Sequence, residues 1–293
     1  MQSRTRTAAA ALLLTASLAG ATLATGSAQA VSGHRAVLSA HPVPRLAPAV
    51  HVRIAVSDHD VTRSRTMFRP GNTIFDVRST GGRGALEVMR LGPHYTVKML
   101  RSDFSGLFNG DVKAVRRVDR RVEFYGGAQV SKARTQSFAT YLDAGRYLIA
   151  DLDTGGLAWM RVVGHPMRRS LPQATGVVNM VGANRFGNPG TRQSSGWMRT
   201  TNRTDEPHFV DLNHVKASTT RKKVRKYLDS GAHGTPPWAL KGEAGTLVVG
   251  PGHTVLWKYS LPRGKYLEMC WWPSDENGMP HAMMGMWELT HLS

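Results

Sequence analysis

GAQVSKARTQSFATYLDAGRYLIAD (residues 127–151) and TLVVGPGHTVLWKYSLPRGKYLEMC (residues 246–270) align without a gap. Each segment alternates apolar and polar residues on both sides of a short turn, Asp-Ala-Gly in one copy and Pro-Arg-Gly in the other. This pattern predicts two consecutive strands with a tight connection. The matched positions include Val130 with Val249, Phe138 with Trp257, Leu142 with Leu261, Gly145 with Gly264, and Tyr147 with Tyr266.

A second pair of segments extends the repeat upstream. FDVRSTGGRGALEVMRL (75–91) and WMRTTNRTDEPHFVDLNHV (197–215) each show a β-rich run, a polar turn and another alternating run. We therefore expect an all-β protein with two homologous domains, about 50–165 and 172–293, because regular short strands separated by turns favour β-sandwiches. One helix is expected around 217–228, with a start at Thr219 and Thr220 and a stop at Gly231.

The N-terminus has the pattern of an export signal. Two arginines precede a long run rich in alanine and leucine, and Ala-Gln-Ala at 28–30 is a small-residue cleavage site. We expect residues 1–30 to be a Sec-type signal peptide that is cleaved near Ala30, followed by a flexible linker over 31–49. No second apolar run follows that could span a membrane. The mature protein is therefore expected to be secreted.

The chain contains one cysteine, Cys270, in the segment CWWPSDENGMPHAMMGM (270–286). Exported proteins usually hold cysteines as disulfides, and a single cysteine cannot form one within the chain. It is therefore a buried thiol, an intermolecular link or a metal ligand. In the repeat, Cys270 stands opposite Asp151, and His208 stands opposite Gly84. The scaffold does not need either residue, so their role belongs to the second domain.

Three segments of the second domain resemble the cupredoxin, or blue copper, family, and in particular secreted cupredoxin-like proteins of actinobacteria. TNRTDEPHFVDL (201–212) resembles the element that carries the first histidine ligand, GKYLEMC (264–270) the strand that ends on the cysteine, and PHAMMGMWEL (280–289) the loop exit and last strand. The resemblance implies two tandem cupredoxin-like Greek-key β-sandwiches. It also implies one type 1-like copper ion held by His208, Cys270, His281 and an axial Met286.

These residue types suit copper, because a thiolate and two imidazoles with a weak thioether accommodate both of its oxidation states. Trp271, Trp272 and Trp287 would supply an apolar shell. One departure from the family is the ten residues between Cys270 and His281, of which 275–278 look like an inserted turn. A loop of this length can still close, because each doubling of loop length adds only about 0.6 kcal/mol to the entropic cost of closure.

Each candidate ligand taken alone has an ordinary interpretation. His208 could be a turn histidine, Cys270 a small buried apolar residue, and Met279, Met283 and Met284 packing residues. A zinc site would favour more cysteine or histidine ligands at closed spacing. A cysteine nucleophile would need an oriented histidine, and no paired His-x-His motif of a multicopper oxidase is present. The remaining histidines, His214, His233, His253 and His291, lack ligand spacing. We therefore expect no enzymatic activity.

The chain is strongly basic, with 38 lysines and arginines against 20 acidic residues and a formal charge of +18. Two groups concentrate this charge, one at Arg116, Arg117, Arg120 and Arg121 and one at Arg221, Lys222, Lys223, Arg225 and Lys226. No nucleic-acid motif accompanies them. The ordinary interpretation, which the sequence favours, is that they are solvated faces that keep the protein soluble; the alternative partners for an exported protein are anionic cell-envelope polymers or lipid headgroups. Two functions remain: an exported copper protein that transfers electrons to a redox partner or handles copper, and a metal-free cupredoxin-like module that binds an anionic partner.

Overall fold

The computed structural model describes residues 46–293 except 133–134, 183 and 188–189. The predicted signal peptide, 1–30, and most of the predicted linker, 31–49, lie outside the described residues. At the end of that linker, Ala47 forms an isolated bridge with Arg169. In the part of the chain that is described, no helix has the length and apolar character to cross a bilayer.

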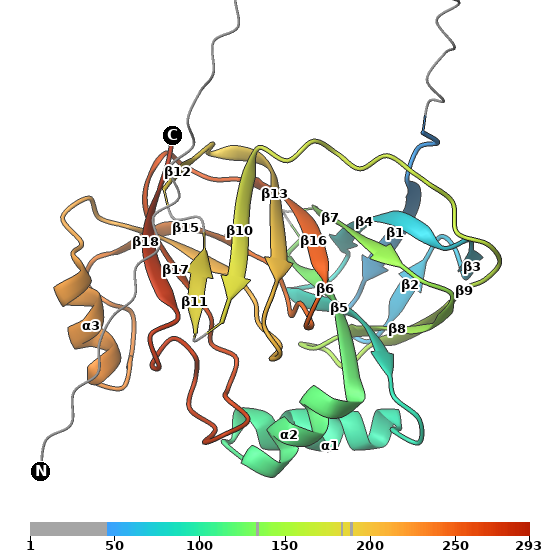
Figure 1. Cartoon of the computed structure of the whole chain (residues 1–293), viewed down its shortest axis with the longest axis horizontal. Coiled ribbons are helices and arrows are strands. Elements are labelled where there is room, and N and C mark those ends of the chain that lie inside the picture. The colour runs from blue at the N-terminus through green and yellow to red at the C-terminus, as the bar shows by residue number, and fades with distance from the viewer. Residues whose placement is uncertain (1–45, 133–134, 183, 188–189) are drawn as a thin grey trace, which may run out of the picture. The chain divides into compact units, whose positions relative to one another are not determined.

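Two halves of the chain have the same order of elements (Figure 1). The first half contains β1 (Val50–Val56), β2 (Val61–Arg63), β3 (Met67–Phe68), β4 (Gly71–Ser79), β5 (Gly84–Leu91), α1 (Val97–Phe108), α2 (Val112–Arg121), β6 (Val122–Val130), β7 (Gln136–Leu142), β8 (Gly145–Asp151) and β9 (Leu157–Val162). The second half contains β10 (Gly176–Val181), β11 (Arg185–Gly187), β12 (Thr191–Arg192), β13 (Ser195–Asn202), β14 (Asp211–Val215), α3 (Arg221–Asp229), β15 (Ala239–Gly245), β16 (Thr254–Ser260), β17 (Gly264–Met269) and β18 (Trp287–Leu292).

The strands of the two halves also pair in the same way. One five-stranded sheet has the order β3-β9-β8-β5-β6, and its counterpart has the order β12-β18-β17-β14-β15. The remaining strands form one eight-stranded sheet, β11-β10-β13-β16-β7-β4-β1-β2, to which each half contributes four strands. This arrangement confirms the predicted all-β fold with two tandem sandwich halves. The domain boundaries at 50–165 and 172–293 stay a prediction.

The alternation of side chains along the strands explains the sandwich. In β1, with the sequence VHVRIAV, Val50, Val52, Ile54 and Val56 are buried, whereas His51 and Arg53 are exposed. A strand with this period of two can bury one face against another sheet while the other face meets water. The apolar core formed in this way extends through both halves and includes Cys270, Trp272 and Met286.

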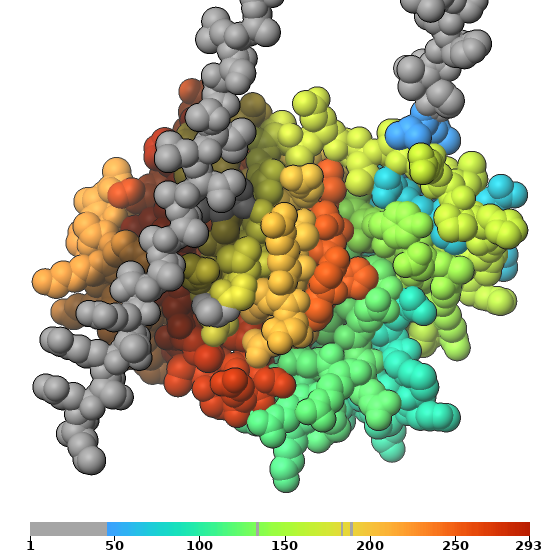
Figure 2. All heavy atoms as spheres, viewed as in Figure 1, coloured from blue at the N-terminus to red at the C-terminus, as the bar shows by residue number. Residues whose placement is uncertain are grey.

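The two copies of the repeat meet at the centre of the eight-stranded sheet. β16 pairs antiparallel with β7, and the matched residues Phe138 and Trp257 are direct partners in the register. Both side chains are completely buried, and the Phe138 ring stacks on Phe75 with centroids 4.8 Å apart. Figures 1 and 2 show β16 lying directly against strands of the first half. Because the pair is symmetric, the two halves are related by an approximate two-fold axis at this point.

The predicted tight connections are present, but each one joins strands of different sheets. The chain passes from β7 to β8, and from β16 to β17, by turning from the eight-stranded sheet into a five-stranded one. A buried tyrosine fixes each turn: the Tyr147 hydroxyl donates to the Asp143 carbonyl at 2.8 Å, and the Tyr266 hydroxyl donates to the Pro262 carbonyl at 2.7 Å. This hydrogen bond is the tyrosine corner of β-sandwich proteins.

The helices differ from the sequence prediction. The predicted helix is present as α3, and its N-cap is Thr220, whose side chain accepts from the Lys223 amide. The prediction of a single helix was wrong, because α1 and α2 occupy the same position between β5 and β6 that α3 occupies between β14 and β15. Side chains of Thr96 and Asp111 cap α1 and α2. The apolar stripe of α2 is only Ala114, Val115 and Val118 among five basic residues, so the helical period of apolar residues is weak in the sequence.

Replacement of either corner tyrosine should destabilise the protein. Tyr147→Phe and Tyr266→Phe each remove one partly buried hydrogen bond and leave a turn carbonyl without this donor, which costs about 1–2 kcal/mol. Urea unfolding should therefore show a lower midpoint for both variants. Tyr141→Phe is the matched control, because Tyr141 is 44% exposed. Wild-type midpoints for both corner variants would contradict the structural role of these hydroxyls.

Candidate metal centre

Cys270 lies directly after the central strand of the second five-stranded sheet. β17 ends at Met269 and is paired on one side with β14 and on the other with β18. The Cys270 side chain is completely buried, and its Sγ accepts the Phe209 amide at 3.5 Å. Its own amide donates to the Met286 carbonyl at 3.2 Å. The sheet therefore holds the sulfur in one place.

His208 is presented by the turn between β13 and β14. The buried Asn202 side chain organises this turn: its amide donates to the carbonyls of Glu206 and Val249, and its oxygen accepts from Thr204. His208 then forms a bridge with Val249, with two backbone hydrogen bonds of 3.2 and 2.7 Å. Because a buried amide with all its partners satisfied is rigid, the turn fixes the direction in which His208 points.

His281 comes from the long loop between β17 and β18, and this loop is closed at its neck. Pro273 and Pro280 form an antiparallel bridge, and the His281 amide donates to the Trp272 carbonyl at 2.9 Å. Within the turn, the Ser274 amide donates to Met279, and Gly278 donates to Ser274. The inserted residues therefore form a separate turn that does not displace His281 from Cys270.

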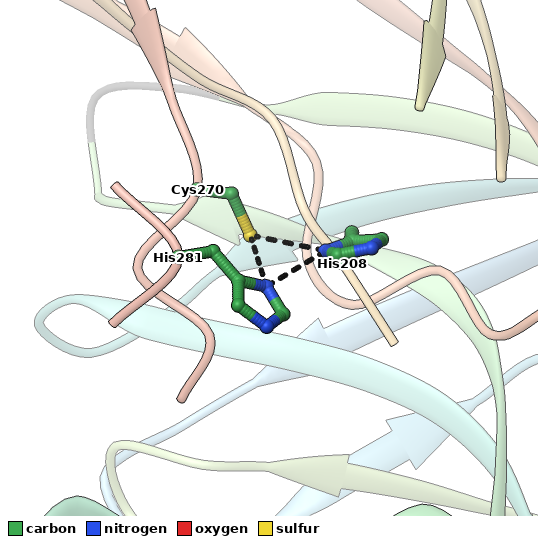
Figure 3. Close-up of side chains that lie close together, drawn as sticks. All are labelled: His208, Cys270 and His281. Atoms are coloured by element: carbon green, nitrogen blue, oxygen red, sulfur yellow. Dashed lines mark hydrogen bonds between the residues drawn. The ribbon is translucent and has the colours of Figure 1, made fainter. Parts of the chain in front are cut away.

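Three donor atoms converge from these elements (Figure 3). The Nδ1 atoms of His208 and His281 are 2.9 Å apart, and Cys270 Sγ lies 3.7 Å from the first and 3.9 Å from the second. A point equally distant from the three atoms lies about 2.1 Å from each, within the usual range of metal–nitrogen and metal–sulfur bonds. The three side chains are at most 2% exposed. The residues present therefore fit a single metal ion.

Burial also sets the protonation of two of these side chains. The pKa of His208 is lowered to about 3, chiefly because burial penalises the imidazolium and also because His281 lies beside it. The imidazole is therefore neutral at pH 7 and has a lone pair for a metal. The pKa of the Cys270 thiol is raised to about 12 by burial, although the amides of Phe209 and Trp272 favour the thiolate. A metal must displace the thiol proton to bind there.

Glu206, which sequence reasoning missed, lies beside the imidazole of His281. Its Oε2 lies 2.8 Å from His281 Nε2, although the direction falls short of a well-aligned hydrogen bond. A carboxylate in this position favours the proton on Nε2 and leaves Nδ1 free for a metal. The acidic residue two places before His208 in DEPH was the available sequence signal, but spacing alone does not reveal that it contacts a different histidine.

Met286, the predicted axial ligand, lies next to both loop ligands through its backbone. Its amide donates to the His281 carbonyl at 2.8 Å, and its carbonyl accepts from Cys270. The side chain is completely buried in the same apolar cluster as Cys270. Gly285 precedes it with φ of 113°, a conformation that favours glycine. Met284 is half-buried and lines a hollow of about 180 Å³ beside His208. The axial role of the Met286 sulfur stays a prediction.

The first half holds a carboxylate where the second holds the thiol. Asp151 Oδ1 accepts the Ala85 amide at 2.8 Å, as Cys270 Sγ accepts the amide of Phe209. Asp151 also accepts from the Thr154 hydroxyl at 2.5 Å. Gly84 contributes no donor, and β9 begins at Leu157 without a long loop. Among the described residues, no second group of three histidine, cysteine or carboxylate side chains comes together in this way.

The donor set, two histidines and a cysteine with Met286 following in the sequence, is of the kind that suits a type 1 copper site. No family model and no curated protein matches the chain. Among solved structures, reduced auracyanin from Roseiflexus castenholzii matches with 16% identity and a TM-score of 0.27, covering 41% of this chain and 98% of that one. Auracyanin A, a blue copper protein from Chloroflexus aurantiacus, has 12% identity and a TM-score of 0.27, with coverage of 41% and 100%.

A copper-containing nitrite reductase from Thermus scotoductus covers more of the chain. The match spans 84% of this chain and 61% of the reductase, with 11% identity and a TM-score of 0.22. Such distant likenesses do not bear on what this chain binds. The chemistry of the site therefore follows from its own residues.

The metal-free protein should lose stability as the pH falls below about 6.5. An unfolded histidine titrates near 6.5, whereas the pKa of His208 in the folded protein is about 3. Between these values only the unfolded chain binds this proton, so stability present above pH 6.5 is lost toward pH 3, by up to about 1.4 kcal/mol per pH unit. Urea unfolding with a chelator at several pH values measures this slope.

His208→Gln provides the comparison, because it removes the titrating group. Its stability should fall less steeply than that of the wild type between about pH 6.5 and 5, above the range in which most carboxylates titrate. Identical slopes for the two proteins would contradict a depressed pKa for His208.

Proposed function

We propose that this protein binds one copper ion in a type 1-like site and serves electron transfer or copper handling at the cell envelope. The observation that supports the proposal is the convergence of two buried imidazole nitrogens and a buried cysteine sulfur at 2.9, 3.7 and 3.9 Å. A soft thiolate with two imidazoles binds both Cu(I) and Cu(II). Bound copper would supply one-electron exchange between these two states.

The chain's own residues would hold the metal in a fixed and dry environment. His208 and His281 would bind through Nδ1, and Cys270 through Sγ after loss of its proton. Trp272, which is 2% exposed, and the completely buried Met286 belong to the core around the sulfur. A rigid apolar surrounding limits solvent access and tunes the potential of a metal. This combination suits electron transfer better than the activation of a substrate, so we propose no catalytic activity.

Export is part of the proposal, and it rests on the sequence of residues 1–30. A thiolate–copper site at the cell envelope would meet a redox partner protein or a copper donor.

The second candidate function is a metal-free module that binds an anionic polymer, and it is supported by the exposed basic residues of α3. Lys222, Lys223 and Arg225 are all exposed on that helix. Copper binding distinguishes the two candidates.

Titration of the purified protein with Cu(II) tests the proposal. We expect one equivalent to bind, with an intense blue or green colour from the copper–thiolate bond. About one proton should be released per copper near pH 7, because the Cys270 thiol is protonated beforehand. Cys270→Ser, which keeps the size of the side chain, should abolish the colour. A wild-type protein that stays colourless and binds no copper would favour the metal-free module.

The axial position should belong to Met286 rather than Met284. Met286→Leu should retain copper but shift its reduction potential and visible spectrum, because an axial thioether tunes the metal more than it holds it. Met284→Leu is the matched control, since Met284 is half-buried and lines the neighbouring hollow. Spectroelectrochemistry of both variants measures the shift. A change in Met284→Leu without one in Met286→Leu would reverse the assignment.

A further inference from the structure

The helices α1 and α2 of the first half contact the loop that carries His281. Figure 2 shows atoms of the C-terminal loop, in red, against those of α2, in green. This contact joins the first half, which has no candidate metal ligands among its described residues, to the long loop between β17 and β18. It raises the question of what the first half contributes to that site.

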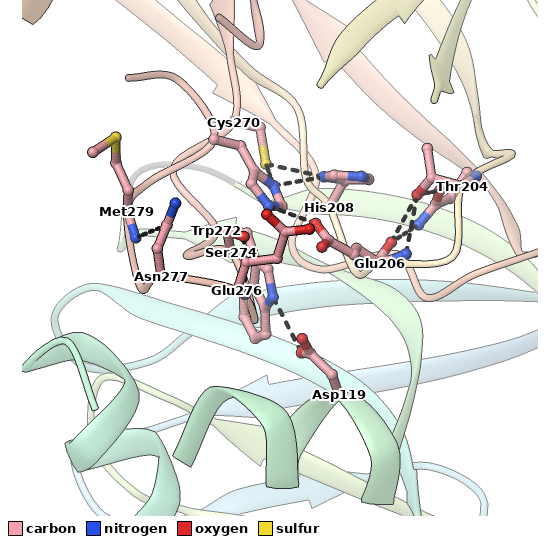
Figure 4. Close-up of polar contacts among 12 residues, drawn as sticks. Asp119, Thr204, Glu206, His208, Cys270, Trp272, Ser274, Glu276, Asn277 and Met279 are labelled. Carbon is pink, nitrogen blue, oxygen red and sulfur yellow. Dashed lines mark hydrogen bonds and ion pairs between the residues drawn. The ribbon is translucent and has the colours of Figure 1, made fainter. Parts of the chain in front are cut away.

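Trp272, two residues after Cys270, is the buried part of this contact. Its indole Nε1 donates to Asp119 Oδ1 of α2 at 3.3 Å (Figure 4). Its ring packs edge to face against Phe124 and Phe104 of the first half, with centroids 5.5 and 6.5 Å away. Aromatic pairs of this geometry favour one orientation of the ring. The carbonyl of Trp272 is also the acceptor for the His281 amide.

Arg116 is the exposed part of the contact. Its Nε donates to the Asp275 carbonyl at 2.7 Å, and one terminal nitrogen donates to the Glu276 carbonyl at 3.4 Å. The guanidinium therefore binds the backbone at the tip of the inserted turn. Gly278 approaches α2 closely as well: a Cβ at this position would lie 3.2 Å from the Gly110 carbonyl oxygen and from a methyl carbon of Val112. The start of α2 and its Arg116 thus contact the turn at two points, near Gly278 and at the carbonyls of Asp275 and Glu276.

The contacts with α2 restrict the conformations of the long loop, which would otherwise lose conformational entropy when a metal binds. Ten residues between Cys270 and His281 give the free loop many conformations, and only those with His281 Nδ1 near Cys270 Sγ are useful. Ligands must be held within about 0.5 Å of their working positions for a site to function. The loop has its own closing hydrogen bonds, and the carbonyls at its tip accept from Arg116 of the first half.

Resting on the copper-binding function proposed above, we propose that the first half is a brace that preorganises the copper loop, with Arg116, Asp119 and Trp272 as positioning residues. The Arg116 guanidinium therefore binds carbonyls of this chain rather than an external anion. Arg117 is likewise engaged, because its guanidinium pairs with Asp103 at 2.6 Å. Of the four arginines grouped in the sequence, these two do not form a free docking surface.

Hydrogen exchange of the full-length, metal-free protein tests the brace without copper. Arg116→Met removes the two donor contacts and keeps the length of the side chain, and Trp272→Phe removes the Nε1–H but keeps a ring. In both variants the amides of Gly278 and His281 should exchange at least 10-fold faster. Arg120→Met is the matched control, because Arg120 lies on the exposed side of the same helix. In this control variant the amides of Gly278 and His281 should exchange at the wild-type rate.

Copper release into excess chelator gives the second readout. Loss of a contact that orients metal ligands typically weakens binding by about 10- to 100-fold, so we expect release from Arg116→Met to be about 10-fold faster than from the wild type and from Arg120→Met. If the Gly278 and His281 amides exchange at the wild-type rate in both Arg116→Met and Trp272→Phe, the proposal that the first half holds the loop is wrong. If the wild type binds no copper, the proposed function fails, and the exchange rates alone decide whether the first half holds the loop.

Discussion

The pairing of β7 with β16 is the contact on which the rest of the molecule depends. It places Phe138 and Trp257, equivalent residues of the repeat, side by side and joins two four-stranded sheets into one of eight. Backbone hydrogen bonds in a sheet are directional, so this pairing restricts the orientation of one half against the other. The same orientation brings α2 to the loop that carries His281.

Divergence within the repeat explains how one scaffold serves two roles. Asp151 ends the central strand of one five-stranded sheet, and Cys270 directly follows the central strand of the other. Both accept a backbone amide, from Ala85 in the first half and from Phe209 in the second. The scaffold therefore requires an acceptor at this position but not a thiol. In the second half a histidine and a long loop are added, and the acceptor becomes a candidate copper ligand. In the first half the acceptor, Asp151, binds the Ala85 amide and the Thr154 hydroxyl.

The strands were largely predictable from the sequence, and the helices of the first half were not. Alternation over 136–151 and 254–269 requires one buried face, and no other common structure has this period. By contrast, α2 buries only Ala114, Val115 and Val118 and depends on the cap at Asp111 and on packing against its neighbours. Its arginines suggested an external anionic partner, because a sequence does not show that Arg116 contacts a loop about 160 residues later.

The sequence alone determined which residues could bind a metal and in which half they lie. The order His208, Cys270, His281, Met286 and its absence from the repeat are visible without coordinates, because ligand chemistry depends on residue type. Only the tertiary structure decided that the first three donor atoms converge, that the inserted turn closes at Pro273 and Pro280, and that Glu206 faces His281. These features arise from contacts between distant segments. Such contacts depend on how both halves pack, and local sequence patterns carry no information about that packing.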